Sequence, residues 1–269
     1  MMSIFRRHPQ NQNKPSLKMI SLGGWGTVTQ NLFVYQYNQE ILVVDCGIGF
    51  PEEETPRGDL LVADVDYLVQ NREKIRGIVI THGHEDHYGG LPFVLPKLNR
   101  NIPIYASRLT AALIKEKLED YRLAAKINLI DSRVKVNLGN FDLDFIYLTH
   151  SIPDTYGVAI KTPVGTILHM SDFKFDWTPV MGSRSDVGKI ATFGNQGVVL
   201  LVSDCLRSEK EGYTLSETMV EDSLEREMRH CQGRVFITTI SSNVSRWQQA
   251  INVSVKYGRK VILVGRSIE

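Results

Sequence analysis

The stretch Thr81-His82-Gly83-His84-Glu85-Asp86-His87 follows the apolar run Ile78-Val79-Ile80, and the rest of the chain is organised around these residues. Three histidines and two acidic residues lie within six positions, directly behind a predicted buried strand. Burying so many titratable groups is unfavourable unless cations pair with them. The stretch therefore predicts a metal site rather than a solvated polar loop.

The spacing within this stretch predicts two ions. On an extended backbone His82 and His84 can both turn toward one ion, whereas the adjacent Asp86 and His87 diverge and suit a second ion. Two-metal sites hold their ions about 3.5–4 Å apart, with a hydrolytic water clamped between them. The pattern is therefore typical of a metal-dependent hydrolase.

Three further polar residues follow apolar runs and complete this predicted site. His150 and Asp172 each end a later apolar run, so both are expected at the same edge of a sheet as the first stretch. Together they supply a third nitrogen for the first ion and a carboxylate able to bridge both ions. Asp45, at the end of an earlier run, is expected to orient a ligand histidine from behind.

Composition narrows the class of protein. The chain has 269 residues, of which 23% are charged and 42% hydrophobic, so it can bury a sizeable core. This length fits one domain plus part of another. The formal net charge of +1 gives no global electrostatic footprint for a nucleic acid, so any such contact must come from a local basic patch. No apolar stretch approaches the ~18 residues of a membrane-spanning helix, so no membrane partner is expected.

Cys46, Cys205 and Cys231 are odd in number and widely spaced. They fit neither a disulfide framework nor a Cys-x-x-Cys zinc site. A reducing compartment, and therefore a cytoplasmic location, is the simplest interpretation.

The order of predicted elements divides the chain into three parts. Residues 1–16 are expected to be a flexible polar tail, residues 17–212 a first domain, and residues 213–269 the beginning of a second. In the first domain the patterns predict strands over 19–22, 31–37, 40–44, 77–80 and 103–106, helices over 65–75 and 107–118, a strand-rich part over 127–172 and a buried strand over 197–202. In the second they predict a capping box at Thr214 to Glu217 that opens a helix to about His230, strands over 234–240 and 260–264, and a helix over 243–257.

These residues, in this order, resemble the metallo-β-lactamase fold superfamily, and more closely the ribonuclease J branch of its β-CASP nucleases. The closer resemblance rests on Ile48-Gly49-Phe50-Pro51 after Asp45-Cys46-Gly47, on residues 81–92, on His150-Ser151-Ile152-Pro153-Asp154 and on Ser171-Asp172-Phe173-Lys174-Phe175-Asp176. It implies an α/β fold: a metallo-β-lactamase αββα sandwich followed by the start of a parallel α/β β-CASP domain.

The resemblance also implies an activity. Members of this branch hydrolyse RNA endonucleolytically and as 5′-to-3′ exonucleases, so single-stranded RNA with a 5′-monophosphate end is the expected substrate. The expected metal ligands are His82, His84, Asp86, His87, His150 and Asp172. Asp86 and His87 are the expected catalytic residues, with Asp86 orienting or deprotonating a water that bridges two Zn²⁺ ions. Mn²⁺ is an alternative, because imidazole and carboxylate suit both metals.

The resemblance extends to one later motif and also shows where this chain departs from the family. Val202-Ser203-Asp204 resembles the first β-CASP motif, which gives Asp204 a supporting role behind the ligands. The chain departs from the family at Gly26 to Asn31, where glutamate and lysine are common, and at Ser245-Arg246, where His-Arg is common. Later β-CASP segments and a late metal-binding histidine have no counterpart.

Basic residues near the strand ends are candidates for phosphate contacts: Lys174, Arg207, Lys210 and Arg266.

Two other functions remain open from the sequence. One is a metallo-hydrolase of small esters or thioesters, since a shared fold does not fix the substrate. The other is a non-catalytic RNA-binding or assembly subunit that keeps the fold. A homo-oligomer is compatible with the sequence, which does not specify the oligomeric state.

Overall fold

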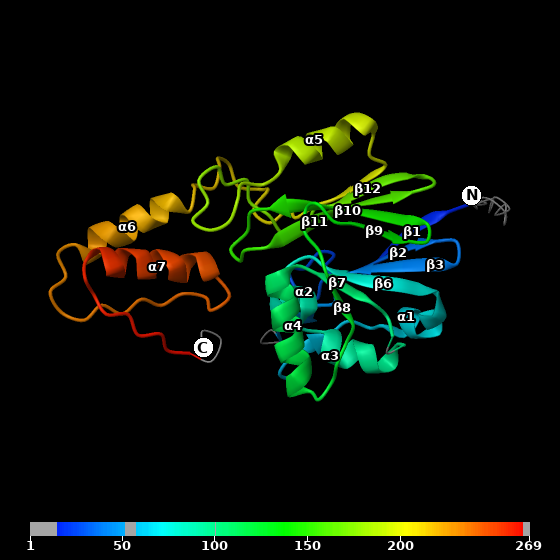
Figure 1. Cartoon of the computed structure of the whole chain (residues 1–269), viewed down its shortest axis with the longest axis horizontal. Helices are drawn as coiled ribbons and strands as arrows, with labels where there is room; N and C mark the ends of the chain where they lie inside the picture. Colours follow the sequence, from blue (N-terminus) through cyan, green and yellow to red (C-terminus); the bar gives the residue numbers. More distant parts are fainter. Residues whose placement is uncertain (1–14, 52–57, 100, 266–269) are drawn as a thin grey trace, which may run out of the picture.

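A computed structural model of the chain describes residues 15–51, 58–99 and 101–265. Two mixed β-sheets pack face to face, and helices cover both outer surfaces (Figure 1). The predicted tail over 1–16 lies outside the described residues except for its last two positions. The predicted boundary between 212 and 213 stays a prediction.

The first three predicted strands form an antiparallel meander at the start of the first sheet. Its strands are β1 (Leu17–Gly23), β2 (Leu32–Tyr37), β3 (Glu40–Val44), β6 (Ile75–Ile80), β7 (Ile104–Ala106) and β8 (Ile127–Leu129), in the order β1-β2-β3-β6-β7-β8. From β3 onward the pairing is parallel. The carboxyl ends of β3 and β6 therefore meet at one edge.

The second sheet has the order β13-β12-β11-β10-β9. Its strands are β9 (Lys135–Leu138), β10 (Phe141–Leu148), β11 (Thr155–Thr162), β12 (Gly165–His169) and β13 (Leu200–Val202). Both β10 and β12 run antiparallel to the β11 strand between them, so their carboxyl ends also share an edge. A separate two-stranded ribbon pairs β4 (Ile48–Gly49) with β5 (Leu61–Val62).

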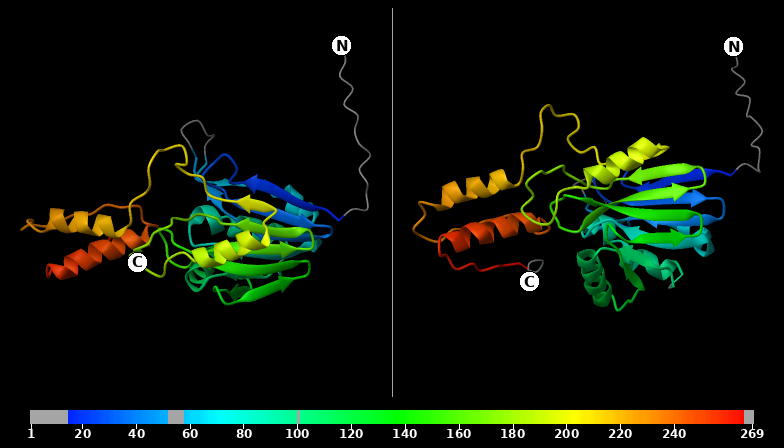
Figure 2. Two further views of the ribbon diagram at one scale, coloured as in Figure 1. Left: turned by 90° about the horizontal axis from the view of Figure 1, so that it is seen from above. Right: turned by 45° about the horizontal axis from the view of Figure 1, so that its top comes forward.

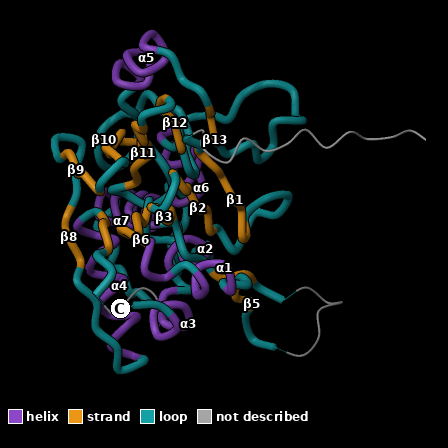
Figure 3. The backbone as a smooth tube through the Cα atoms, turned by 90° about the vertical axis from the view of Figure 1, so that its right-hand side faces the viewer, coloured by secondary structure: helices purple, strands orange, loops and turns teal. Residues whose placement is uncertain are grey.

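The apolar residues form three layers. Tyr35 and Val79 of the first sheet meet Phe145 and Val158 of the second in the central layer. The outer layers lie under α1 (Asp66–Gln70), α3 (Leu91–Val94) and α4 (Arg108–Asp120) on one side and under α5 (Val187–Gln196) on the other (Figure 3). This arrangement is the predicted αββα sandwich.

Of the two helices predicted within the sandwich, one forms with its predicted cap and the other is shorter than predicted. Ser107 caps α4, because its hydroxyl accepts a hydrogen bond from the Thr110 N–H. The predicted helix over 65–75 is shorter, since α1 is followed by a 3₁₀ turn, Arg72–Lys74, and Ile75 already belongs to β6. A second 3₁₀ turn, Leu95–Lys97, follows α3 and contains Pro96, which cannot donate the backbone hydrogen bond of a continuing α-helix.

The strand predicted over 197–202 is only partly buried. β13 covers Leu200–Val202, and Val199 and Leu201 are 59% and 60% exposed. The prediction of a buried strand was wrong because β13 lies at the edge of the sheet, with only β12 beside it in the described part of the chain.

Two helices lie side by side beyond the sandwich, α6 (Thr218–Met228) and α7 (Val244–Lys256) (Figure 2). The predicted start of α7 is confirmed, with Asn243 as its side-chain cap. The predicted capping box at Thr214 to Glu217 is wrong. The helix α6 begins only at Thr218, and the Glu217 N–H, expected inside the first turn, donates to Asp176 of the sandwich instead. A distant partner therefore overrode a local pattern.

The strands predicted over 234–240 and 260–264 do not form among the described residues. Phe236 is 87% and Ile262 84% exposed, so these apolar segments pack against no second layer in that part of the chain. A strand needs a neighbour to satisfy its backbone groups, which local sequence cannot supply. No described helix is long and apolar enough to cross a membrane.

Candidate metal centre

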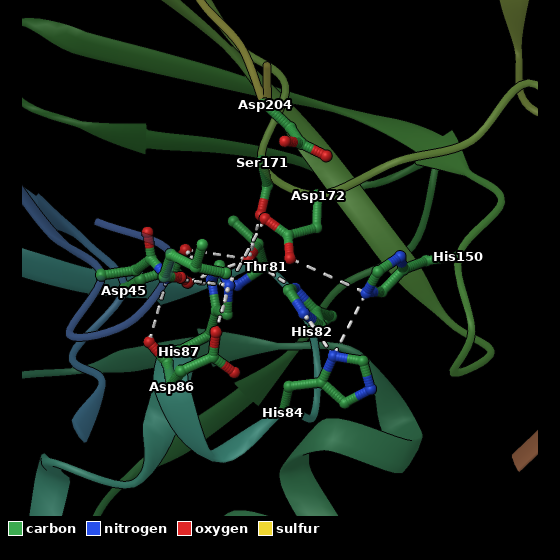
Figure 4. A network of polar contacts seen from close by, with 12 residues as sticks. Asp45, Thr81, His82, His84, Asp86, His87, His150, Ser171, Asp172 and Asp204 are labelled. Atoms are coloured by element: carbon green, nitrogen blue, oxygen red, sulfur yellow. Dashed lines mark hydrogen bonds and ion pairs between the residues drawn. The ribbon is translucent and has the colours of Figure 1, made fainter. Parts of the chain in front are cut away.

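The candidate site lies where several strands end together (Figure 4). Asp45 follows β3, the stretch over 82–87 follows β6, His150 follows β10 and Asp172 follows β12. The strand directions bring these four loops to one edge of the sandwich, as the sequence predicted from the run ends.

The backbone after β6 changes conformation at His84. His84 is extended, with φ −94° and ψ 143°, and the one-turn helix α2 (Glu85–Tyr88) begins at the next residue. This turn packs directly on the loop after β3, where the Cys46 N–H donates to the His87 carbonyl oxygen over 2.7 Å. A Cβ on Gly47 would lie 1.6 Å from the Asp86 carbonyl oxygen, so only glycine permits this approach.

Three histidine nitrogens converge in a first cluster. His82 Nε2 lies 3.1 Å from His84 Nδ1, and His150 Nε2 lies 3.1 Å from the same atom. A tetrahedral zinc ion with Zn–N bonds of about 2.0–2.1 Å spaces its ligand nitrogens by roughly 3.3–3.4 Å. The donor set and its spacing therefore fit one ion, and His150 takes the place predicted for a third nitrogen.

A second cluster shares one residue with the first. Donor atoms of His82, His87 and Asp172 all lie within 4.8 Å of one another. Asp172 Oδ1 is 3.5 Å from His87 Nε2, and its Oδ2 is 3.8 Å from His150 Nε2. Asp172 thus lies between the two clusters, where a bridging carboxylate was predicted.

The grouping differs in detail from the predicted one. The residue spacing predicts that His82 binds the first ion alone and that Asp86 and His87 bind the second. In the structure His82 belongs to both clusters, and its ring centroid is 4.0 Å from that of His87. Asp86 approaches the second cluster with Oδ2 3.6 Å from His87 Nε2. The roles of these six residues as metal ligands stay predictions.

Asp45 lies behind the clusters, as expected. It is fully buried, and its Oδ2 lies 2.8 Å from His87 Nδ1. The Thr81 N–H donates to Asp45 Oδ1 over 2.8 Å, and the Thr81 hydroxyl lies 3.1 Å from His82 Nδ1. These contacts orient His82 and His87 with their Nε2 atoms toward the clusters.

Charge and burial give the histidines different protonation behaviour. Burial lowers the pKa of His84 to about 4 and that of His150 to about 3, and it lowers the pKa of His82 well below its usual value. These imidazoles are neutral at pH 7, which is the form that binds a metal. Burial alone would lower the pKa of His87, but Asp45 and Asp172 outweigh it and raise this pKa well above its usual value.

Burial and neighbouring charges also shift the pKa values of the two carboxylates, in opposite directions. Burial would raise the pKa of Asp172, but His87 outweighs it and lowers the pKa to about 2. Burial raises the pKa of Asp86. A cation bound in the second cluster would displace the proton on His87 and take over its role as the partner of Asp172.

The remaining predicted residues have separate surroundings. Asp204 lines the same cavity as His87 and Asp172, and its side chain accepts a hydrogen bond from the Leu206 N–H rather than contacting a described histidine. Arg207 also lines this cavity, and Lys210 is exposed. Lys174 pairs with Glu217 at 2.9 Å, so its charge is already balanced. Arg266 lies outside the described residues.

Several site residues were missed by the sequence argument. The Asn31 side-chain amide lies 3.1 Å from His87 Nε2, and the Ser171 hydroxyl is 2.8 Å from that of Thr81. His169 contacts the Tyr35 hydroxyl at 2.8 Å beside the cavity. The position of Asn31 between a glycine-rich loop and a strand was the available signal.

Comparison with known proteins agrees with this geometry. A family model described as the beta-lactamase superfamily domain matches residues 41–188, just over half of the chain. The chain therefore belongs to the β-lactamase superfamily, in which the fold and a His/Asp group indicate metal binding. A second model, the β-CASP domain of ribonuclease J, matches residues 232–269.

Similar curated proteins are ribonucleases J. Ribonuclease J of Thermus thermophilus is 45% identical over 259 residues, which cover 94% of this chain and 45% of that protein. Ribonuclease J2 of Bacillus subtilis is 37% identical over 262 residues, which cover 97% of this chain and 47% of that protein. The chain thus spans less than half the length of these relatives.

A solved structure shares the fold. The crystal structure of a protein of unknown function from Enterococcus faecalis V583 superposes with a TM-score of 0.63 at 13% identity, covering 93% of this chain and 71% of that chain. At this identity the likeness extends to the fold alone.

Proposed function

We propose that this chain carries the metal centre of a ribonuclease J-like enzyme that hydrolyses phosphodiester bonds of RNA. The observation that carries the proposal is the pair of clusters that share His82 and have Asp172 between them. Two adjacent cation sites suit an in-line displacement at phosphorus. Both family models and the ribonuclease J relatives support RNA as the substrate.

The residues of this chain have distinct roles in the proposed reaction. His82, His84 and His150 hold one ion, while His82, His87, Asp86 and Asp172 surround the other. When bound, the ions polarise a water and neutralise charge on the scissile phosphate. Asp86, whose side chain is 19% exposed next to the second cluster, orients this water or accepts its proton.

Zinc is the proposed metal. The first cluster offers three imidazole nitrogens at nearly tetrahedral spacing, a donor set that suits Zn²⁺. The carboxylates of the second cluster also suit Mn²⁺, which is the alternative.

The cavity beside the second cluster is the proposed place for the RNA backbone. It has a volume of about 390 Å³ and is lined by Asn31, His87, Asp172, Asp204 and Arg207. Arg207, which lines this cavity, is the proposed phosphate contact. Single-stranded RNA with a 5′-monophosphate end, cleaved both internally and from that end, is the proposed substrate, in a cytoplasmic enzyme. Residues 17–212 and 213–269 are the proposed domains.

The proposal is tested with 5′-monophosphorylated RNA and the purified, zinc-loaded chain. Cleavage is expected for the wild type and for the exposed-site control Asp131→Asn, and it should fall by at least ~10³-fold in the Asp86→Ala, His87→Ala double variant. Equal rates in the wild type and the double variant would rule out catalysis by this chain. Faster turnover of a thioester than of RNA would favour the small-ester hydrolase, which the β-CASP match argues against.

A further inference from the structure

The outer nitrogen of His84 has an unexpected partner. His84 Nδ1 faces His82 and His150, so a metal in the first cluster would bind this atom. Its other nitrogen, Nε2, lies 3.3 Å from the carbonyl oxygen of Ser242, which is 158 residues later in the chain. The Ser151 hydroxyl is the second neighbour of this nitrogen, at 3.4 Å.

This contact selects the tautomer that binds metal. A backbone carbonyl can only accept a hydrogen bond, so Nε2 of His84 carries the proton and Nδ1 keeps its lone pair for the ion. His82 and His87 receive the same kind of support from Thr81 and Asp45, both within the sandwich. For His84 alone, among these three ligands, the support comes from the segment that leads into α7.

The segment around Ser242 is held by the start of α7. Asn243 caps the helix by accepting from the Arg246 N–H over 3.0 Å. Two residues after Asn243, the Ser245 N–H donates to the Ser151 carbonyl oxygen over 3.2 Å, which ties the first turn of α7 to the loop that carries His150.

A charged network fastens this turn to the sandwich. Glu217 receives Arg246 of α7 on Oε2 and Lys174 of the sandwich on Oε1, each at 2.9 Å. The Glu217 N–H donates to Asp176 Oδ2 over 2.8 Å. The side chains of Glu217, Lys174 and Arg246 are only 22% to 27% exposed, so these pairs are less screened than surface pairs.

We infer that Arg246 and Glu217 are positioning residues for the metal centre. They hold the Ser242 carbonyl against His84 and thereby make the affinity of the first cluster for its ion depend on the docking of α6 and α7. This inference rests on the proposed metal centre and extends it, because a ligand of the sandwich is completed by the segment that matches the β-CASP model.

The test measures metal affinity rather than cleavage. Zn²⁺ is titrated against a competing chromophoric chelator for the wild type, Arg246→Met, Glu217→Gln and the control Lys256→Met. Lys256 pairs with Glu225 at 2.7 Å between the same two helices and, among the described residues, contacts none of the site, which makes it a matched control. Circular dichroism of each variant verifies that the helices are retained.

The inference expects a selective loss. Arg246→Met should lower the affinity for one of the two ions by about 10- to 100-fold, which is the usual effect of removing an outer partner of a ligand histidine. The affinity for the other ion should stay within twofold of the wild type. Glu217→Gln keeps the side-chain shape and should shift the same ion in the same direction, while Lys256→Met should match the wild type. In zinc-loaded protein, the long-range ¹H–¹⁵N spectrum should show the His84 proton on Nε2, exchanging faster with water in Arg246→Met.

Two results would overturn the inference. One is wild-type affinity for both ions in Arg246→Met and Glu217→Gln, which would mean that water replaces the Ser242 carbonyl without loss. The other is an equal loss at both ions, which would indicate general loosening of the site. Absence of RNA cleavage together with the selective loss would remove the proposed function and leave this inference standing.

Discussion

Replacing Asp45 by asparagine tests how the second cluster is organised. Asp45 Oδ2 lies 2.8 Å from His87 Nδ1, while its Oδ1 accepts from the Thr81 N–H. An asparagine can keep the bond to Thr81 with its oxygen, but its amide group then faces the Nδ1–H of His87 as a second donor. His87 must move its proton to Nε2, the atom that faces Asp172, or lose its partner.

The expected size of the effect follows from this single lost bond. A hydrogen bond to a charged group contributes about 1.5–3 kcal/mol, and about 1.4 kcal/mol corresponds to a tenfold change in affinity. The Asp45→Asn variant should therefore bind the second ion about 10- to 100-fold more weakly. Binding of the first ion should be nearly unaffected. His84 and His150 have no contact with Asp45 in the described structure, and the retained bond to Thr81 keeps the support of His82.

The assay is a competitive zinc titration that resolves the two binding events, with Asp131→Asn as the control. Asp131 is a surface carboxylate paired with Arg133 at 2.8 Å, and its loss should leave both affinities unchanged. Retained near-ultraviolet circular dichroism verifies packing in both variants. If Asp45→Asn bound both ions as tightly as the wild type, the orientation of His87 by Asp45 would have no role in metal binding.

Three further outcomes are expected. Gly47→Ala should destabilise the fold by about 3 kcal/mol in urea titrations, because its Cβ would lie 1.6 Å from the Asp86 carbonyl oxygen. The control Gly194→Ala should leave stability unchanged, because a Cβ at that position has no heavy atom within 4 Å. Equal unfolding midpoints for the two variants would contradict the close approach at Gly47. Burial lowers the pKa of His169 to about 4, so the unfolded chain binds more protons between pH 6.5 and 4 and stability falls as the pH falls through this window. This residue alone accounts for about 3 kcal/mol, so His169→Phe should lose less stability between pH 7 and 4 than the wild type, and parallel pH profiles would refute the assignment. His84→Ala should abolish one zinc equivalent by equilibrium dialysis, and unchanged stoichiometry would show that the first cluster is not a metal site.

The sequence predicted those parts of the fold that local pattern controls. The stretch over 82–87 and the run ends at His150 and Asp172 could be placed at one edge because parallel strand directions bring carboxyl ends together. The strands of the first meander and the Ser107 cap of α4 also depend on neighbours close in sequence, and they form as predicted.

Predictions that depended on distant partners fared differently. The pattern of a capping box predicted that a helix opens at Thr214 and has Glu217 in its first turn. The Glu217 N–H instead donates to Asp176, 41 residues earlier, and the helix starts after it. The apolar segments over 234–240 and 260–264 have the composition of strands and form none among the described residues, because a strand exists only with its neighbour. The contact between Ser242 and His84 joins residues 158 positions apart, so no local sequence pattern predicts it.

Residue spacing also did not predict that His82 belongs to both clusters. Residue spacing indicates which side chains can face one ion, but the one-turn helix α2 folds His87 back until its ring centroid lies 4.0 Å from that of His82. The distance between two rings depends on where the chain turns, which here is fixed by packing of the turn on Gly47.

Metal stoichiometry tests the central claim most directly. The chain is loaded with Zn²⁺, freed of weakly bound metal by gel filtration, and measured by inductively coupled plasma mass spectrometry against protein concentration. The account predicts two zinc ions per chain, and one in the His84→Ala, His150→Ala double variant, whose second cluster keeps His82, His87 and Asp172. Fewer than one ion in the wild type, or two ions in the double variant, would contradict it.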